Sequence, residues 1–375
     1  IALDDGTWNY IEAGDTVSVT GCVNNCPTDL VIPANIDGRP VVSIANSAFA
    51  QTQLTSLTIA NTVTSIGSSA FAYTQLTSVT FPSSVTHIGS SAFAYNQLTN
   101  LAVPDSVIYL DQSAFRDNQL TSVTMGNRLT RIGASAFSDN QLISLTIPES
   151  VTYIGESAFA NNQLTSMTIP DSLTSIDARV FASNMLTNVA IGNSVTHIGD
   201  HAFANNQLTS VTIPDSVTHI GEQTFSQNQL TSVTIGNSLT SIGYAAFLDN
   251  WLTSVTIPDS VTSIGLAVFS QNIGTAIGIW RYFLMSGDLI ITGCSDTCPA
   301  DLVIPNTLAG QPVTGIGDLA FAGSSLTSVS IPDSVTSIGA GAFYGNQLAS
   351  VTIPDSVTNV GVLAFAENLE ADDGL

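Results

Sequence analysis

The 375-residue chain contains no lysine, and charged residues make up only 9% of it. Its basic residues are six arginines, which face 29 acidic residues and leave a formal net charge of -23. Because such a field repels phosphate, this balance argues against nucleic-acid partners and anionic membrane surfaces. The sequence also lacks any run of about 18 apolar residues, so no membrane insertion is expected.

Cysteine is scarce, and the four residues form two pairs of the same spacing, Cys22 with Cys26 and Cys294 with Cys298. A zinc site would need a second pair or a histidine close to each pair, and neither has one nearby in sequence. We therefore expect two local disulfides, which implies an oxidising compartment. The chain opens at Ile1 with no signal-like segment, and we interpret it as a mature product without its export signal.

The dominant feature is a repeat of 22 residues, which is marked by evenly spaced phenylalanines. Residues 208–229 represent the unit, and we number its positions as columns 1–22, starting from Leu208. The phenylalanines occupy column 18 at Phe49, Phe71, Phe93, Phe115, Phe137, Phe159, Phe181, Phe203, Phe225, Phe247 and Phe269, and again at Phe321, Phe343 and Phe365.

Each column predicts a local structure. Leucine, valine and isoleucine at columns 1, 4 and 6 indicate a half-buried strand that ends at the proline of column 7. Valine and isoleucine at columns 10 and 13 indicate a second inward pair, and we expect the glycine of column 14, such as Gly221, to have a positive φ. Alanine and phenylalanine at columns 17 and 18 predict a helical or 3₁₀ turn with stacked rings. The asparagine of column 21 is expected to satisfy backbone groups of the turns.

One unit buries too little apolar surface to offset its loss of conformational entropy, so units must stack. The pattern L-x-x-V-x-I-P-x-x-V-x-x-I-G-x-x-A-F-x-x-N resembles the BspA-like bacterial leucine-rich repeats, and it recurs along nearly the whole chain. This resemblance implies a leucine-rich-repeat solenoid with parallel strands and short turns, mostly β and irregular. It also implies a secreted or cell-surface binding protein, often an adhesin, and it carries no catalytic residues.

The repeat breaks after Asn272 and restarts through a copy of the N-terminal segment, in which Trp8 and Trp280 hold equivalent places. The offset between the copies is constant, apart from a one-residue slip at Gly14-Asp15 and Gly287-Asp288. We expect four parts, which are a capping module (1–48), a first array (49–272), a second such module (273–320), and a short second array with an acidic C-terminus (321–375). The sequence leaves open whether the second module bends the solenoid or forms an enlarged coil.

Columns that vary between units are candidates for function, and column 12 varies most conspicuously. It carries His87, Tyr109, Arg131 and Tyr153 in successive units, where serine is otherwise common. Such side chains are enriched at binding hot spots. Arg116 and Arg128 lie in neighbouring units, and we expect a cationic cluster there. The alternative is neutral drift at an exposed position.

The strand face is the other candidate surface, because columns 2, 3 and 5 are nearly all threonine and serine. Three interpretations compete, namely a soluble outer face, a docking surface for a glycan or protein, and an ice- or water-ordering array. We expect no metal site, since His201 lies beyond the turn from the column-12 pair His197 and His219.

No unique nucleophile and base stand beside each other among the repeated serines, so we expect neither an enzyme nor a cofactor. The sequence predicts an extracellular or cell-surface solenoid that binds a protein or glycan on a cell surface or matrix. The alternative function is a structural spacer or a water-ordering module.

Overall fold

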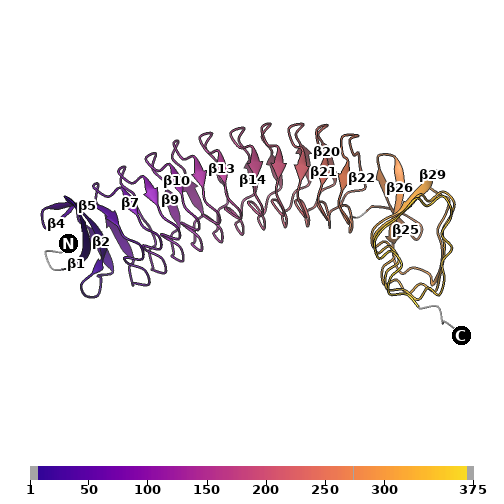
Figure 1. Cartoon of the computed structure of the whole chain (residues 1–375), viewed down its shortest axis with the longest axis horizontal. Helices are drawn as coiled ribbons and strands as arrows, with labels where there is room; N and C mark the ends of the chain where they lie inside the picture. The colour runs from indigo at the N-terminus through magenta and orange to yellow at the C-terminus, as the bar shows by residue number, and fades with distance from the viewer. Residues whose placement is uncertain (1–6, 273, 370–375) are drawn as a thin grey trace. The chain divides into compact units, whose positions relative to one another are not determined.

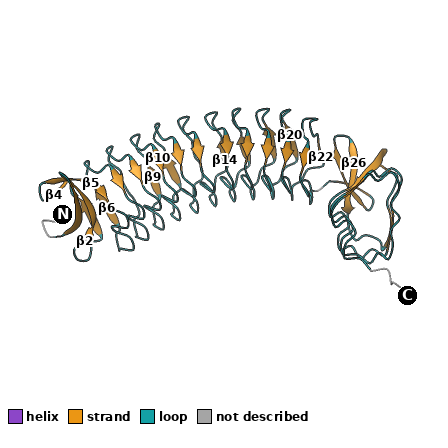
Figure 2. Cartoon of the chain, viewed as in Figure 1, coloured by secondary structure: helices purple, strands orange, loops and turns teal. Residues whose placement is uncertain are grey.

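The computed structural model describes residues 7–272 and 274–369, which form strands, turns and bends, with no helix in these residues (Figure 2). None of the described segments could therefore cross a membrane as a helix. The chain divides into two compact units, residues 1–208 and 209–375. This division falls inside the expected first array, and the bounds of the four expected parts remain a prediction.

The first unit opens with an antiparallel hairpin of β1 (Trp8–Ala13) and β2 (Thr16–Cys22), and β2 pairs in parallel with β5 (Arg39–Ile44) (Figure 1). The sheet continues through the two-residue strands of columns 12 and 13, one per coil, and β4 (Asn35–Ile36) flanks β5. These strands are β7 (Ser65–Ile66), β8 (His87–Ile88), β10 (Tyr109–Leu110), β12 (Arg131–Ile132) and β13 (Tyr153–Ile154). The parallel pairing confirms the predicted solenoid.

A second set of strands in the first unit comes from columns 3 to 6 and forms parallel pairs. The pairs are β3 (Asp29–Ile32) with β6 (Ser56–Ile59), β9 (Asn100–Ala102) with β11 (Ser122–Thr124), and β14 (Ser166–Thr168) with β16 (Asn188–Ala190). On the column-12 side, β15 (Ser175–Ile176) pairs with β17 (His197–Ile198).

The phenylalanine spine forms as predicted. From Phe49 to Phe203 successive rings stack with centroid separations of 5.2 to 5.8 Å and near-parallel planes. Trp8 closes the N-terminal end of this stack, because its ring meets Phe49 edge-on at 6.2 Å. The rings are fully buried, so the stack is the centre of the core.

The column-21 asparagines are buried and serve the backbone, as predicted. The Asn140 amide nitrogen donates to the carbonyls of Phe115 and Phe137 at 3.0 and 3.2 Å, and its oxygen accepts the Leu120 N–H at 3.1 Å. The same arrangement recurs at Asn96, Asn118, Asn162, Asn184 and Asn206. Each amide joins two successive coils.

Two expectations about the turns are wrong. The predicted helical or 3₁₀ turn is a pair of successive β-turns, closed by Ala136 N–H to Gly133 O and Ser138 N–H to Ser135 O, both at 3.2 Å. The left-handed residue is Ser135 (φ 54°) of column 16, not the glycine of column 14. A Cβ on Gly133 would lie 2.6 Å from the carbonyl carbon of Asp111. Column 14 therefore favours glycine because coils approach closely there.

The second unit repeats these ladders. On one side β18 (Ser210–Ile213) pairs with β20 (Ser232–Ile235), and on the other β19 (His219–Ile220), β21 (Ser241–Ile242) and β23 (Ser263–Ile264) pair in series. The remaining strands of this unit are β22 (Ser254–Val255), β24 (Thr275–Ile277), β25 (Trp280–Met285), β26 (Asp288–Cys294), β27 (Asp301–Val303), β28 (Thr307–Leu308), β29 (Gln311–Ile316), β30 (Ser328–Ser330), β31 (Ser337–Ile338) and β32 (Asn359–Val360).

The duplicated sequence segments have the same structure. The hairpin of β25 and β26 has the strand register of β1 and β2, bulge included, and the offset between the two hairpins is constant from end to end. The expected one-residue slip is therefore wrong. The two-residue turns of the hairpins lie at equivalent positions and differ only in which residues occupy them. Each module also holds its predicted disulfide, Cys22–Cys26 and Cys294–Cys298.

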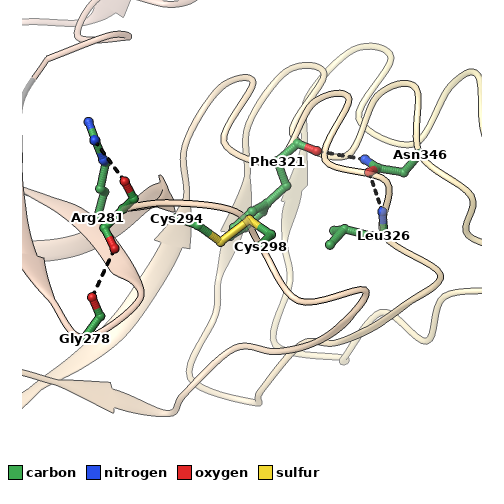
Figure 3. The surroundings of a disulfide bond; sticks show 8 residues. Gly278, Arg281, Cys294, Cys298, Phe321, Leu326 and Asn346 are labelled. Atoms are coloured by element: carbon green, nitrogen blue, oxygen red, sulfur yellow. Dashed lines mark hydrogen bonds between the residues drawn. A yellow bond between two sulfur atoms is a disulfide. The ribbon is translucent and has the colours of Figure 1, made fainter.

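The second module covers the start of the second array. Its disulfide lies beside Phe321, whose carbonyl accepts a hydrogen bond of 2.8 Å from Asn346 (Figure 3). On the opposite edge, β25 pairs in parallel with β22 and antiparallel with β24. Within this unit a strand ladder thus runs from the preceding coil into the module.

Candidate functional site

The column-12 residues of the first unit stand on paired strands, so their side chains form a contiguous row. The pairing places Tyr109 beside His87 on one side and beside Arg131 on the other, and Arg131 beside Tyr153. The next residue of each strand points inward and is buried, which leaves the column-12 side chains facing solvent. We call His87, Tyr109, Arg131 and Tyr153 the column-12 ladder.

The ladder side chains contact one another. The rings of His87 and Tyr109 lie 4.9 Å apart between centroids, and the guanidinium of Arg131 lies 4.7 Å from the centre of the Tyr153 ring. The second contact is a cation–π interaction, which holds both partners in place at an exposed site. Tyr109 and Tyr153 remain 41% and 37% exposed, so their rings are available to a partner.

Two aspartates that replace the column-14 glycine stand at the ends of the ladder. The Asp111 carboxylate lies 3.6 Å from Nε2 of His87, and the Asp177 carboxylate is close enough to the Tyr153 hydroxyl to affect its pKa. Partial burial first, and then the neighbouring Asp177 carboxylate, raise the pKa of Tyr153. Each aspartate belongs to the coil after that of its ladder partner, and it stands two columns later in the repeat. The interaction therefore runs diagonally between coils.

The aspartates occupy positions where a side chain disturbs packing. The Asp111 N–H to Ile88 carbonyl bond is 3.3 Å long, against 2.9 Å for the equivalent bond of Gly133. At Asp177 the strand ladder is interrupted, because β13 ends one sheet and β15 belongs to another among the described strands. The ladder is thus bounded on its C-terminal side by a break between coils.

The expected cationic cluster does not form as one group. Arg116 belongs to column 19, at the turn edge of the coil, where it pairs with Asp117 and Asp139 at 3.1 and 3.2 Å. Arg128 is exposed at column 9, three residues before Arg131. Comparing the repeat units column by column could not predict these ion pairs, because they join residues of different columns.

The turn edge carries residues that the sequence analysis missed. The rings of Tyr73 and Tyr95 stack with centroids 4.3 Å apart. Burial raises the pKa of Tyr95, and the nearby Arg116 charge lowers it by a smaller amount. Arg116 and Arg179 also line a shallow groove of about 300 Å³ along this edge. Both arginines are neutralised by carboxylates, Arg179 by Glu156 at 3.2 Å. Tyr73 and Tyr95 share one column in successive units, which was a signal that could have found the pair.

A substitution at Asp177 tests the link between this residue and the ladder. In Asp177→Asn the pKa of Tyr153 should fall towards the ordinary value of about 10. Because the folded-state pKa of Tyr153 is raised, its contribution to stability is present below the unfolded pKa and is lost as pH rises through the folded pKa. Tyrosine-labelled NMR titration measures the shift. Glu149→Gln, with the same charge change elsewhere, should leave Tyr153 unaffected, and an equal response in both variants would contradict the assignment.

Among the described residues, no group of three or more histidine, cysteine or acidic side chains is placed to hold a metal ion. The stacked parallel coils, the core spine and the exposed row together define the class of the chain, which is a leucine-rich-repeat solenoid.

The chain belongs to the BspA type leucine-rich repeat family, whose model matches residues 42–165, 152–275 and 302–372. Comparison with curated proteins finds no match. Among solved structures, the pneumococcal vaccine antigen PcpA is 18% identical, with a TM-score of 0.54 over 96% of this chain and 93% of that one. A leucine-rich repeat protein from Bacteroides ovatus is 24% identical, with a TM-score of 0.48 over 92% of each chain. At these identities the first likeness supports the fold alone.

Proposed function

We propose that the chain is a non-enzymatic extracellular or cell-surface binding protein that recognises its partner through the column-12 ladder. The partner is a protein or a glycan presented on a cell surface or matrix. The disulfides support an oxidising location. The PcpA likeness supports a fold that a pneumococcal antigen also uses.

The observation that carries this proposal is the placement of Asp111 and Asp177. Both replace a glycine where coils pack closely; the Asp111 carboxylate lies 3.6 Å from His87, and the Asp177 carboxylate raises the pKa of Tyr153. Neutral drift at exposed positions does not explain why two unfavourable replacements of a closely packed glycine lie beside exposed ladder residues. Selection of a recognition surface explains it, because the aspartates hold the ladder side chains in one arrangement. A fixed arrangement reduces the entropy lost on binding.

The threonine rows give the water-ordering alternative less support than the ladder gives the binding proposal. The hydroxyl of Thr231 donates to the Thr209 carbonyl at 3.2 Å, and that of Thr121 to the Thr99 carbonyl at 3.3 Å. Column-2 hydroxyls thus satisfy carbonyls of the preceding coil. These threonines have a role in the fold that needs no ligand.

The triple variant Tyr109→Ser, Arg131→Ser, Tyr153→Ser tests the proposal. Serine is native to this column, so the variant should fold with the same urea midpoint as the parent. Binding of the parent to a glycan array and a panel of matrix glycoproteins should identify a saturable partner, and the triple variant should lose at least about tenfold in affinity, or about 1.4 kcal/mol.

The matched control is His219→Ser, which makes the same kind of change in the same column of the second unit. It should leave affinity unchanged. If the triple variant binds the identified partner as tightly as the parent does, the ladder is not the recognition surface.

A further inference from the structure

The last described coil, residues 348–369, exposes apolar side chains at one end of its core. Val351, Ile353, Phe365 and Leu369 line an open hollow of about 280 Å³, and Ile353 is 41% exposed. Val362 and Leu363 are more exposed still, at 64% and 66%. An open hollow lined by apolar side chains is a candidate interaction surface.

The same surface exists earlier in the chain, where it is covered. Residues 254–262 and 350–358 have the same sequence, Ser-Val-Thr-Ile-Pro-Asp-Ser-Val-Thr. The coil of residues 252–272 receives β25, so that Val255 pairs with Met285 and is only 5% exposed. Ser254–Val255 is a strand there, whereas Ser350 and Val351 are not in a strand.

Ring stacking and hydrogen bonds complete the covered junction. Phe283 of β25 stacks on Phe269 at 5.2 Å and is 3% exposed. The Ser286 N–H donates to the Val255 carbonyl at 3.1 Å, and its hydroxyl accepts the Ile257 N–H at 3.1 Å. The hairpin therefore binds a coil end through one edge strand and one large apolar side chain.

The chain carries a second copy of this hairpin with its binding edge exposed. β1 is the terminal strand of its sheet among the described strands, and it has the register of β25. Ile11 holds the position of Phe283 and is 61% exposed. An unpaired edge with an apolar residue can accept another chain.

We propose that the chain associates head to tail with a second copy, through β1 of one molecule and the coil 348–369 of the next. By the register of the covered junction, Glu12 of one copy pairs with Ser350 of the other, and Ala13 with Val351. Ile11 lies against Phe365, as Phe283 lies against Phe269. Such an interface is heterologous, so it propagates into linear assemblies or closes into rings.

Charge sets the conditions of assembly. Each copy has a net charge of -23, so copies repel one another at low ionic strength. Salt screens this repulsion, because the Debye length falls to about 3 Å at 1 M. The average mass should therefore rise with both protein concentration and salt.

Sedimentation velocity of the full chain in low and high sodium chloride tests the proposal. The parent should form dimers and larger species at high salt, and both Ile11→Asp and Val351→Asp should remain monomeric. Ile143→Asp changes another exposed aliphatic residue and should associate like the parent. Circular dichroism and urea unfolding verify that all variants are folded.

Mixing the two monomeric variants gives the decisive result. The Ile11→Asp copy retains an intact coil 348–369, and the Val351→Asp copy retains an intact β1. The mixture should form dimers and nothing larger. A parent that stays monomeric at high salt and about millimolar concentration would overturn the proposal, and so would an Ile11→Asp variant that associates by itself.

Discussion

Replacing Asn140 by alanine should lower the free energy of unfolding of the chain by on the order of 2–4 kcal/mol, because the buried Leu120 N–H would lose its partner and the carbonyls of Phe115 and Phe137 would each lose one of two donors. The Phe115 carbonyl keeps the amide of Asn118 at 3.1 Å, and the Phe137 carbonyl keeps that of Asn162 at 2.9 Å. Water cannot replace the amide without opening the core, since Asn140 is 7% exposed. Urea unfolding followed by circular dichroism measures the change.

Two further variants make this result specific. Asn140→Thr should lose less, because Thr74 occupies the same column and donates its hydroxyl to the Phe71 carbonyl at 3.2 Å. Gln141→Ala changes the next residue, whose side chain is exposed, and should be nearly neutral. Equal losses in Asn140→Ala and Gln141→Ala would mean that the asparagine column does not support the fold.

Gly133→Val should destabilise the chain by about 3 kcal/mol and separate the strands of the column-12 ladder at that coil. The added Cβ would lie 2.6 Å from backbone atoms of Asp111 and Gln112, which cannot move without shifting the preceding coil. Asp111 and Asp177 show the direction of the response, a lengthened hydrogen bond in one case and an interrupted sheet in the other. Urea unfolding measures the loss, and amide hydrogen exchange at Arg131 and Ile132 reports the strand separation.

Gln112→Val is the matched control for this substitution. Column 15 accepts residues of every size, and Gln112 is exposed, so the same β-branched side chain should cost less than about 0.5 kcal/mol there. If Gly133→Val is equally mild, the coils can separate freely, and close approach is not the reason for glycine in column 14.

The sequence predicted much of the fold because a solenoid brings residues of the same column together in successive coils. Phenylalanines one repeat apart had to stack, and asparagines one repeat apart had to follow the same turn. The order of His87, Tyr109, Arg131 and Tyr153 followed from the same rule, and the paired strands confirm that order. The role of this row in binding stays a prediction.

The contacts that sequence reasoning missed run diagonally between columns. His87 of column 12 meets Asp111 of column 14, whereas Arg116 of column 19 meets Asp139 of column 20, each in the next coil. Their distances depend on side-chain direction and coil pitch, which a comparison of columns does not contain. The glycine of column 14 was misjudged for a related reason, since a short approach between coils and a positive φ both select glycine.

The asparagine column also gives the array a direction. Each amide closes the start of its own coil and, at the same time, binds the phenylalanine carbonyl of the coil before it. The Phe115 carbonyl, which Asn118 of its own coil already binds, therefore gains its second donor only when the next coil is in place. A chain that emerges from the ribosome or crosses a membrane N-terminus first can settle coil by coil behind the β1–β2 hairpin, with only the newest coil incomplete at any moment.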